Sequence, residues 1–231
     1  MSGIAGACFV FSLVLSAACP GLAHQLDLNL KITLRVYNYA KASGVILEQA
    51  KREANRIFQV AGIETVWLDC LSHPTGEHPS TPCQKPVTAM DLVLRILAEH
   101  GSTRREFLDT HLGFALPSDK GGSYASIFYP DVENSAENEG VPQNQLLGHA
   151  IAHEIGHLLL NSSAHSPSGL MRGKWDSKDL RHATRGDLLF TADQAATMRV
   201  EVLRRIRRCE RQDTNAEAGV QLCRELLENR K

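Results

Sequence analysis

The sequence has no excess of either charge and, after its first 23 residues, no long apolar run. Its 25 basic and 26 acidic residues are interspersed and give a formal net charge of −1 at pH 7. Such a chain has no basic surface that would bind nucleic acid or an acidic membrane. Nothing after residue 23 is apolar for long enough to span a bilayer. Residues 24–231 have the length of one domain with a substantial core, and we expect a monomer without nucleic-acid or membrane partners.

Residues 1–23 contain no Lys or Arg, but otherwise they have the pattern of a secretory signal peptide. The run from Ile4 to Ala18 is apolar, and Gly21 and Ala23 are small residues suited to cleavage before His24. We therefore predict a signal peptide at 1–23 and export of the mature chain, secreted or periplasmic. Two alternatives remain open, a lipid anchor at Cys19 and a retained membrane anchor.

The sequence also contains no CxxC pair, which argues against a zinc site made of cysteines. Four cysteines lie outside the predicted signal peptide: Cys70, Cys83, Cys209 and Cys223. In an exported chain they suggest two disulfides, for which three pairings are possible. Proximity in the sequence favours Cys70 with Cys83 and Cys209 with Cys223.

The strongest chemical signal is His153-Glu154-Ile155-Gly156-His157, an HExxH pattern. On a helix, His153 and His157 lie one turn apart on the same face, so both imidazoles can bind one ion. Zinc prefers such ligands and keeps one coordination position open for water, whose pKa it lowers towards neutrality. Glu154 is placed to accept the proton of that water. The pattern predicts a metal-dependent hydrolase with one catalytic Zn²⁺.

The residues around the motif predict a helix that is buried on one side. Pro142 suits the first turn of a helix, and apolar residues follow at helical spacing. They are Leu146, Leu147, Ala150, Ile151, Ile155, Leu158 and Leu159. A competing interpretation is a buried helix whose histidines only form hydrogen bonds. His149 extends the row of histidines, but it lies too far from His157 to share an ion, so we interpret it as a core or supporting residue.

A third zinc ligand is expected after this helix. Asn161 tolerates the left-handed conformation that ends helices, and a polar turn then leads to His165. Pro167-Ser168-Gly169 makes a second turn, followed by Met171. The alternative third ligand is Glu201, from a downstream helix.

This arrangement resembles the metzincin metallopeptidases, and among them the matrixins. The resemblance implies zinc on His153, His157 and His165, Glu154 as general base, and Met171 as the Met-turn residue beneath the metal. It also implies an α+β, zincin-like fold with a mixed twisted sheet, an active-site helix and a helical C-terminal part. In that scheme residues 24–160 form the sheet and active-site helix, and 161–231 the Met-turn and C-terminal helices.

The sequence departs from the family after the second histidine. Leu160 stands where metzincins have Gly, and His165 comes two residues later than their third His. We interpret this as a longer helix in which Asn161 makes the turn.

A second match to matrixins lies upstream, in the segments Leu112–Pro117 and Gly121–Phe128. The resemblance implies that Gly122, Ser123, Tyr124 and Ala125 belong to the edge strand that binds an extended peptide substrate. Matrixins often carry structural metal ligands here. Because Ser and Tyr stand at those positions, we expect no structural metal.

The remaining pattern predicts the other elements. Strands are expected at 28–39, 65–68 and 92–97, with a helix at 44–60 and an irregular loop at 71–88. Residues 172–185 are expected to be irregular, 192–208 to be helical after a cap at Thr191, 213–219 to turn, and 220–227 to form a short final helix.

Together these features predict an exported zinc metalloendopeptidase that acts on a peptide or protein. Three alternatives stay open: a gluzincin-type peptidase with Glu201 as third ligand, a metallohydrolase of small amides, and a zincin-like domain that binds without catalysis.

Overall fold

The computed structural model describes residues 30–70, 81–99, 112–118 and 122–228. The predicted signal peptide at 1–23, with the alternative anchor at Cys19, lies outside the described residues and stays a prediction. No helix in the described ranges is both long and apolar enough to cross a membrane.

The centre of the fold is a five-stranded sheet with the strand order β2-β1-β3-β5-β4. Four strands run parallel, whereas β4 pairs antiparallel with β5 and lies at the edge. The strands are β1 (Lys31–Asn38), β2 (Glu64–Asp69), β3 (Asp91–Leu97), β4 (Gly113–Leu116) and β5 (Tyr124–Phe128).

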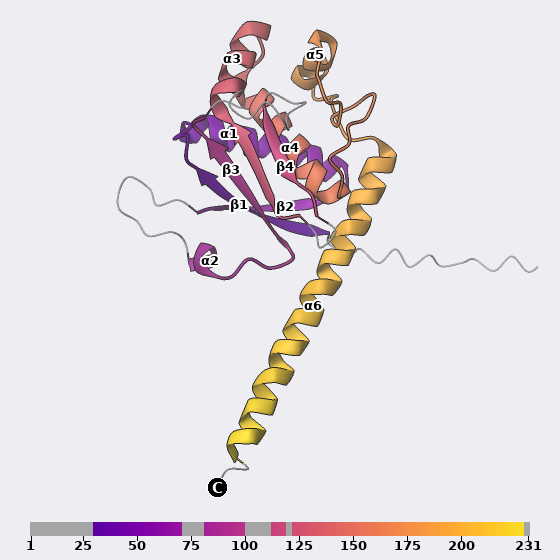
Figure 1. The fold of residues 1–231 in the computed structure, drawn as a ribbon. Helices are drawn as coiled ribbons and strands as arrows, with labels where there is room; N and C mark the ends of the chain where they lie inside the picture. Colours follow the sequence, from indigo (N-terminus) through magenta and orange to yellow (C-terminus); the bar gives the residue numbers. More distant parts are fainter. Residues whose placement is uncertain (1–29, 71–80, 100–111, 119–121, 229–231) are drawn as a thin grey trace, which may run out of the picture.

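Two helices, α1 and α4, pack against each other and against one face of the sheet (Figure 1). Every residue of α4 from Leu146 to Leu159 is buried. The helix that carries the HExxH pattern is therefore the centre of the core. The helices are α1 (Gly44–Val60), α2 (Thr81–Gln84), α3 (Tyr129–Glu139), α4 (Gln143–Leu160), α5 (Ser177–Arg185) and α6 (Ala192–Glu228).

The α+β class with a mixed sheet is confirmed, and α1 has the predicted bounds. Ser43 caps α1 by accepting a hydrogen bond from the N–H of Ile46. Asn161 ends α4 in the left-handed conformation, with φ 49° and ψ 42°, as its position suggested. The helix α3 was not predicted, although Pro130 in its first turn and the left-handed Gly140 at its end are ordinary helix boundaries.

The prediction that Gly122–Ala125 belong to an edge strand is wrong. Tyr124 and Ala125 lie in β5, which pairs with β3 on one side and with β4 on the other. The edge is β4, because the chain enters the sheet there first and then folds back to insert β5 between β3 and β4.

Residues 172–185 are not irregular throughout, since α5 forms within them. Asp176 and Asp179 form a capping box at its start, in which each side chain accepts a hydrogen bond from the other's backbone N–H. The sequence contains this capping pattern, but the many other charged residues between 172 and 185 favoured the prediction of an irregular segment.

The predicted turn at 213–219 is also wrong, because α6 continues through it to Glu228. In Figure 1 the C-terminal half of α6 extends away from the sheet. Asp, Asn and Gly reduce helix propensity by only roughly 0.7–1 kcal/mol each, so they do not have to end a helix.

The continuous helix contradicts the predicted pairing of Cys209 with Cys223. Fourteen residues of helix separate the two positions by roughly 21 Å, whereas disulfide-bonded Cα atoms lie within about 7 Å. Cys209 is a free thiol. Cys70 and Cys83, in contrast, form the predicted disulfide.

Removing the Cys70–Cys83 disulfide is expected to destabilise the fold. The bond closes a loop between residues that are 13 apart, and such a loop restricts the unfolded chain by about 3 kcal/mol. The double variant Cys70→Ser/Cys83→Ser should therefore show a lower denaturant midpoint by equilibrium unfolding. Cys209→Ser is the matched control and should change the midpoint little; equal midpoints for both variants would contradict the expectation.

Candidate metal centre

Three histidines converge at the C-terminal half of α4. His153 and His157 come from the helix, and His165 comes from the segment that follows it. The Nε2 atoms of His153 and His157 lie 3.1 Å apart. One ring nitrogen from each of the three histidines lies within 4.8 Å of the other two. Among the described residues this is the only group of three metal-ligating side chains so arranged.

Backbone carbonyls orient two of the three rings. His153 Nδ1 lies 2.8 Å from the carbonyl oxygen of Leu170, and His157 Nδ1 lies 2.7 Å from that of Ser162. Because a carbonyl can only accept, each Nδ1 carries the proton and donates it. The lone pair is then on Nε2, the atom that faces the other histidines. This is the usual way in which outer partners orient metal-binding imidazoles.

The environment also keeps these rings neutral. Burial lowers the pKa of His153 to about 3, with His157 as the next contribution. Burial is the main cause that lowers the pKa of His157 as well. A neutral imidazole is the form that binds a metal ion, so both side chains are in the required state at pH 7.

His165 provides a test of whether the site fits a cation. Its Nε2 is buried and has no hydrogen-bond partner, which costs about 1–3 kcal/mol when nothing compensates. Two acceptor nitrogens at 3.1 Å also repel each other unless a cation or proton lies between them. Three imidazole ligands with a fourth position open are the ligand set of a catalytic zinc. The residues therefore fit one zinc ion.

The alternative third ligand, Glu201, is not in this cluster. It lies on α6, where its carboxylate accepts a hydrogen bond from Arg208 at 2.7 Å and pairs with Arg205 at 3.2 Å. Arg205 is itself buried, so Glu201 compensates a buried charge. The structure thus brings His165 to the cluster and gives Glu201 a different role.

Met171 lies directly beneath the helix that carries the histidines. It is buried, and a Cβ added at Gly156 would lie 2.7 Å from its sulfur. The turn before it is held by the N–H of Leu170, which donates to Leu189 O, and by the left-handed Gly169. Met171 therefore packs against Gly156 of the motif, and its role as a Met-turn residue beneath a metal stays a prediction.

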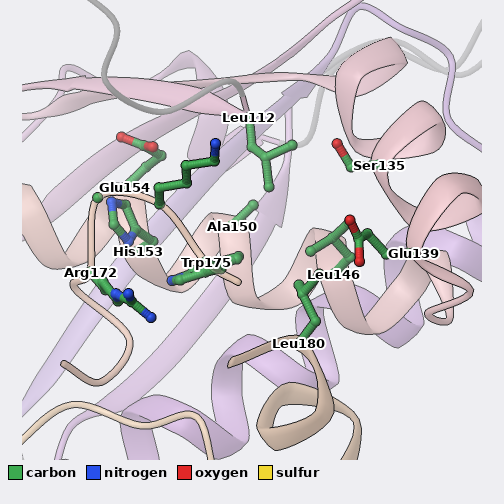
Figure 2. Close-up of a pocket in the computed structure, with 12 residues that line it drawn as sticks. Leu112, Ser135, Glu139, Leu146, Ala150, His153, Glu154, Arg172, Trp175 and Leu180 are labelled. Carbon is green, nitrogen blue, oxygen red and sulfur yellow. The ribbon is translucent and has the colours of Figure 1, made fainter. Parts of the chain in front are cut away.

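Glu154 is buried and lies beside His153 at one end of the group of residues that line a cavity of about 260 Å³ (Figure 2). Glu154 also lies close to the edge strand β4. A Cβ added at Gly113 of this strand would lie 2.9 Å from Glu154 Cγ. The cavity walls are mainly apolar, with charged side chains of Glu139, Arg172 and Lys174 around them. The apolar lining includes Leu112, Leu146, Ala150, Trp175 and Leu180.

Trp175 is a site residue that the sequence did not reveal. Its Nε1 donates a hydrogen bond to Leu170 O at 3.1 Å, the oxygen that also accepts from His153. Its ring packs edge-on against His153, with centroids 5.6 Å apart. His149 is fully buried and its Nδ1 lies 2.9 Å from Gln145 O, so it is a core residue outside the cluster, as predicted.

Gly173 is a second site residue that the sequence did not reveal. Because it has no side chain, its backbone can lie against the ring of His165. A Cβ added there would lie 2.9 Å from His165 Cγ and 3.0 Å from Nδ1, so a side chain would displace the ring. Gly173→Ala is expected to weaken zinc binding by roughly 10–100-fold, the range found for residues that orient a ligand.

The affinity is measured by competition with a chromophoric chelator. The matched control is Gly44→Ala, at a position with no neighbouring atom within 4 Å of the added Cβ. Unchanged zinc affinity in Gly173→Ala would show that the position of His165 does not matter for the metal.

No protein-family model matches the sequence, and no curated protein is significantly similar to it. Among solved structures, the chain is similar to the crystal structure of a zinc-dependent peptidase from Methanocorpusculum labreanum. The two are 12% identical, the match covers 71% of this chain and 99% of that one, and the TM-score is 0.45. A similarity this low establishes neither fold nor function, so the assignment of the site rests on its own geometry.

Proposed function

We propose that the protein is a zinc-dependent endopeptidase whose metal ligands are His153, His157 and His165. The observation that carries the proposal is the convergence of three imidazoles, two of them oriented by backbone carbonyls, beside the buried Glu154 at the end of a cavity. A domain that only binds metal needs no carboxylate at that place, so Glu154 favours an enzyme over a binding module. The alternative that relied on Glu201 has no support, since that side chain compensates Arg205.

The roles of the residues follow from their positions. When bound, zinc supplies a Lewis acid that polarises the scissile carbonyl and makes water acidic enough to react at neutral pH. Glu154 acts as general base: its carboxylate takes a proton from the attacking water and passes it to the amine that leaves. Met171 supports the helix beneath the ligands, and the carbonyls of Leu170 and Ser162 hold two rings in place.

The strand along which the substrate binds is β4, and not the segment Gly122–Ala125 that the sequence predicted. Gly113 touches Glu154, so an extended chain paired along the outer side of β4 passes over the general base. Strand addition supplies backbone hydrogen bonds that a small amide does not use, which favours a peptide or protein as substrate. The apolar cavity beside Glu154 accepts the side chain next to the scissile bond.

Subclass and compartment are part of the same proposal. A third histidine followed by a turn and a buried methionine supports a metzincin-like enzyme. The Cys70–Cys83 disulfide fits an oxidising compartment, which supports an exported protein.

The experiment is to express the mature chain, measure its zinc content, and incubate it with an unbiased peptide library. Mass spectrometry should find internal cleavage that stops on addition of a chelator and returns with zinc. A protein that binds one zinc and cleaves no peptide would contradict the proposal.

A further inference from the structure

The edge of the sheet carries a pair of large apolar side chains that are exposed. Leu116 of β4 is 54% exposed and Tyr124 of β5 is 47% exposed. They are aligned partners in the antiparallel pair, so their side chains stand side by side on one face of the sheet. Isolated apolar residues are common on surfaces, but an aligned apolar pair at an open edge is a place where a further strand gains contact area.

The pair lies on the face of the sheet opposite to α4. A Cβ at Gly113 would point at Glu154 of α4, so Gly113 and Ala115 face the helix and Phe114 and Leu116 face away, because strand residues alternate. Phe114 also packs on Phe128 on this face, with ring centroids 5.7 Å apart. The two β4 side chains thus form an apolar row along the edge.

The hydrogen-bond pattern shows how a strand would add beside them. The N–H of Phe128 donates to Leu112 O at 2.9 Å, so Leu112 and, by alternation, Leu116 direct their backbone groups to β5. Ala115 then directs its N–H and C=O away from β5, towards the side where no strand pairs with β4 among the described residues. In a peptide that is hydrogen-bonded to Ala115, the residue aligned with Leu116 would pack its side chain against Leu116.

The distance of Leu116 from Glu154 along the strand indicates which residue of the substrate would lie beside Leu116. Leu116 follows Gly113 by three positions, or about 10 Å of strand, and Gly113 touches Glu154. Antiparallel pairing is the more stable kind, and it places the amino-terminal side of the substrate at Leu116. The carboxyl-terminal side then lies towards Leu112, which lines the cavity.

We infer that Leu116, against which Tyr124 lies on the neighbouring strand, recognises a large apolar side chain about three residues before the scissile bond. The inference rests on the proposed function, since it places a second selective contact along the same substrate. The cavity and this exposed pair then lie on opposite sides of the scissile bond. The protein would recognise one side chain of the peptide at each of these two places.

The test uses two peptides that differ only at that position, Phe in one and Ser in the other. The wild-type protein should cleave the Phe peptide with a kcat/KM about tenfold higher. In Leu116→Ser the preference should fall to about twofold, because the Phe peptide loses its apolar contact, and Leu116→Met should keep the preference. Val60→Ser removes an exposed apolar side chain from α1 and is the matched control.

A binding measurement separates this inference from the proposed function. Fluorescence anisotropy with the same peptides and the Glu154→Gln protein should show the same preference and its loss in the Leu116→Ser background. If the peptides bind selectively but the wild type cleaves neither, the proposed function fails and the recognition site stands. Equal binding of both peptides, an unchanged preference in Leu116→Ser, or a variant that changes only self-association in sedimentation would overturn the inference.

Discussion

Replacing Glu154 with Gln is expected to leave zinc bound and to reduce peptide hydrolysis by at least about 10²–10⁴-fold. The reason is that, in the proposed mechanism, the carboxylate is the general base and is not one of the three converging histidine nitrogens. General-base catalysis alone accounts for the stated factor. Gln keeps the volume of a side chain that is only 2% exposed, so the variant should leave no new hole beside the metal. Glu154→Ala should lose turnover as well.

The measurement is kcat/KM on one peptide from the library, together with zinc content of the same preparation. Glu139→Gln is the matched control: it removes a second carboxylate of the same cavity, one that is exposed and accepts a hydrogen bond from Ser177. This variant should remain active. Near-native turnover in Glu154→Gln would disprove the mechanism, and loss of zinc would make Glu154 part of the metal site.

The His165→Ala variant is expected to lose zinc at micromolar free metal. It removes one of the three proposed protein ligands, and the loss should exceed the roughly 10–100-fold effect of changing a residue that only orients a ligand. His153 and His157 are held by Leu170 and Ser162 independently of His165, so two imidazoles should remain in position. The fold itself should survive, because His165 lies on a turn and outside the apolar core.

The variant to compare is Glu201→Gln, which keeps zinc if His165 is the third ligand. Glu201→Ala should keep zinc too, but it leaves Arg205 buried without its carboxylate and should lower stability. Zinc can be followed by elemental analysis after gel filtration and by quenching of Trp175 on addition of Co²⁺, since this indole lies 5.6 Å from the His153 ring. Zinc retained by His165→Ala and lost by Glu201→Gln would transfer the protein to the gluzincin type.

The features of the fold and of the histidine cluster that the sequence predicted depend on local geometry. His153 and His157 are one helical turn apart, so a helix is enough to bring their rings together. Asn161 ends that helix by its own conformational preference, and the disulfide at Cys70 joins a cysteine only 13 residues away. Each of these is determined within a short stretch of chain.

What could not be predicted depends on contacts between distant segments. The order of strands decides whether β4 or β5 is the edge, and alternation of apolar residues is the same in both positions. Trp175 and Gly173 belong to the site only because the chain after Met171 turns back over His165 and His153. The length of α6 differs from the prediction for a local reason, since weak helix formers such as Gly219 predict a turn although the helix continues through them.

The carbonyl oxygen of Leu170 has a consequence for how metal and substrate influence each other. It accepts one hydrogen bond from His153 and one from Trp175, and the indole is also a wall of the cavity in which we propose that the substrate binds. A side chain that enters the cavity and shifts the indole changes the competition for that oxygen, and thereby the orientation of a metal ligand. The free energies of peptide binding and zinc binding are then coupled through one atom. By thermodynamic reciprocity, whatever factor a peptide applies to the affinity for zinc, zinc applies to the affinity for that peptide.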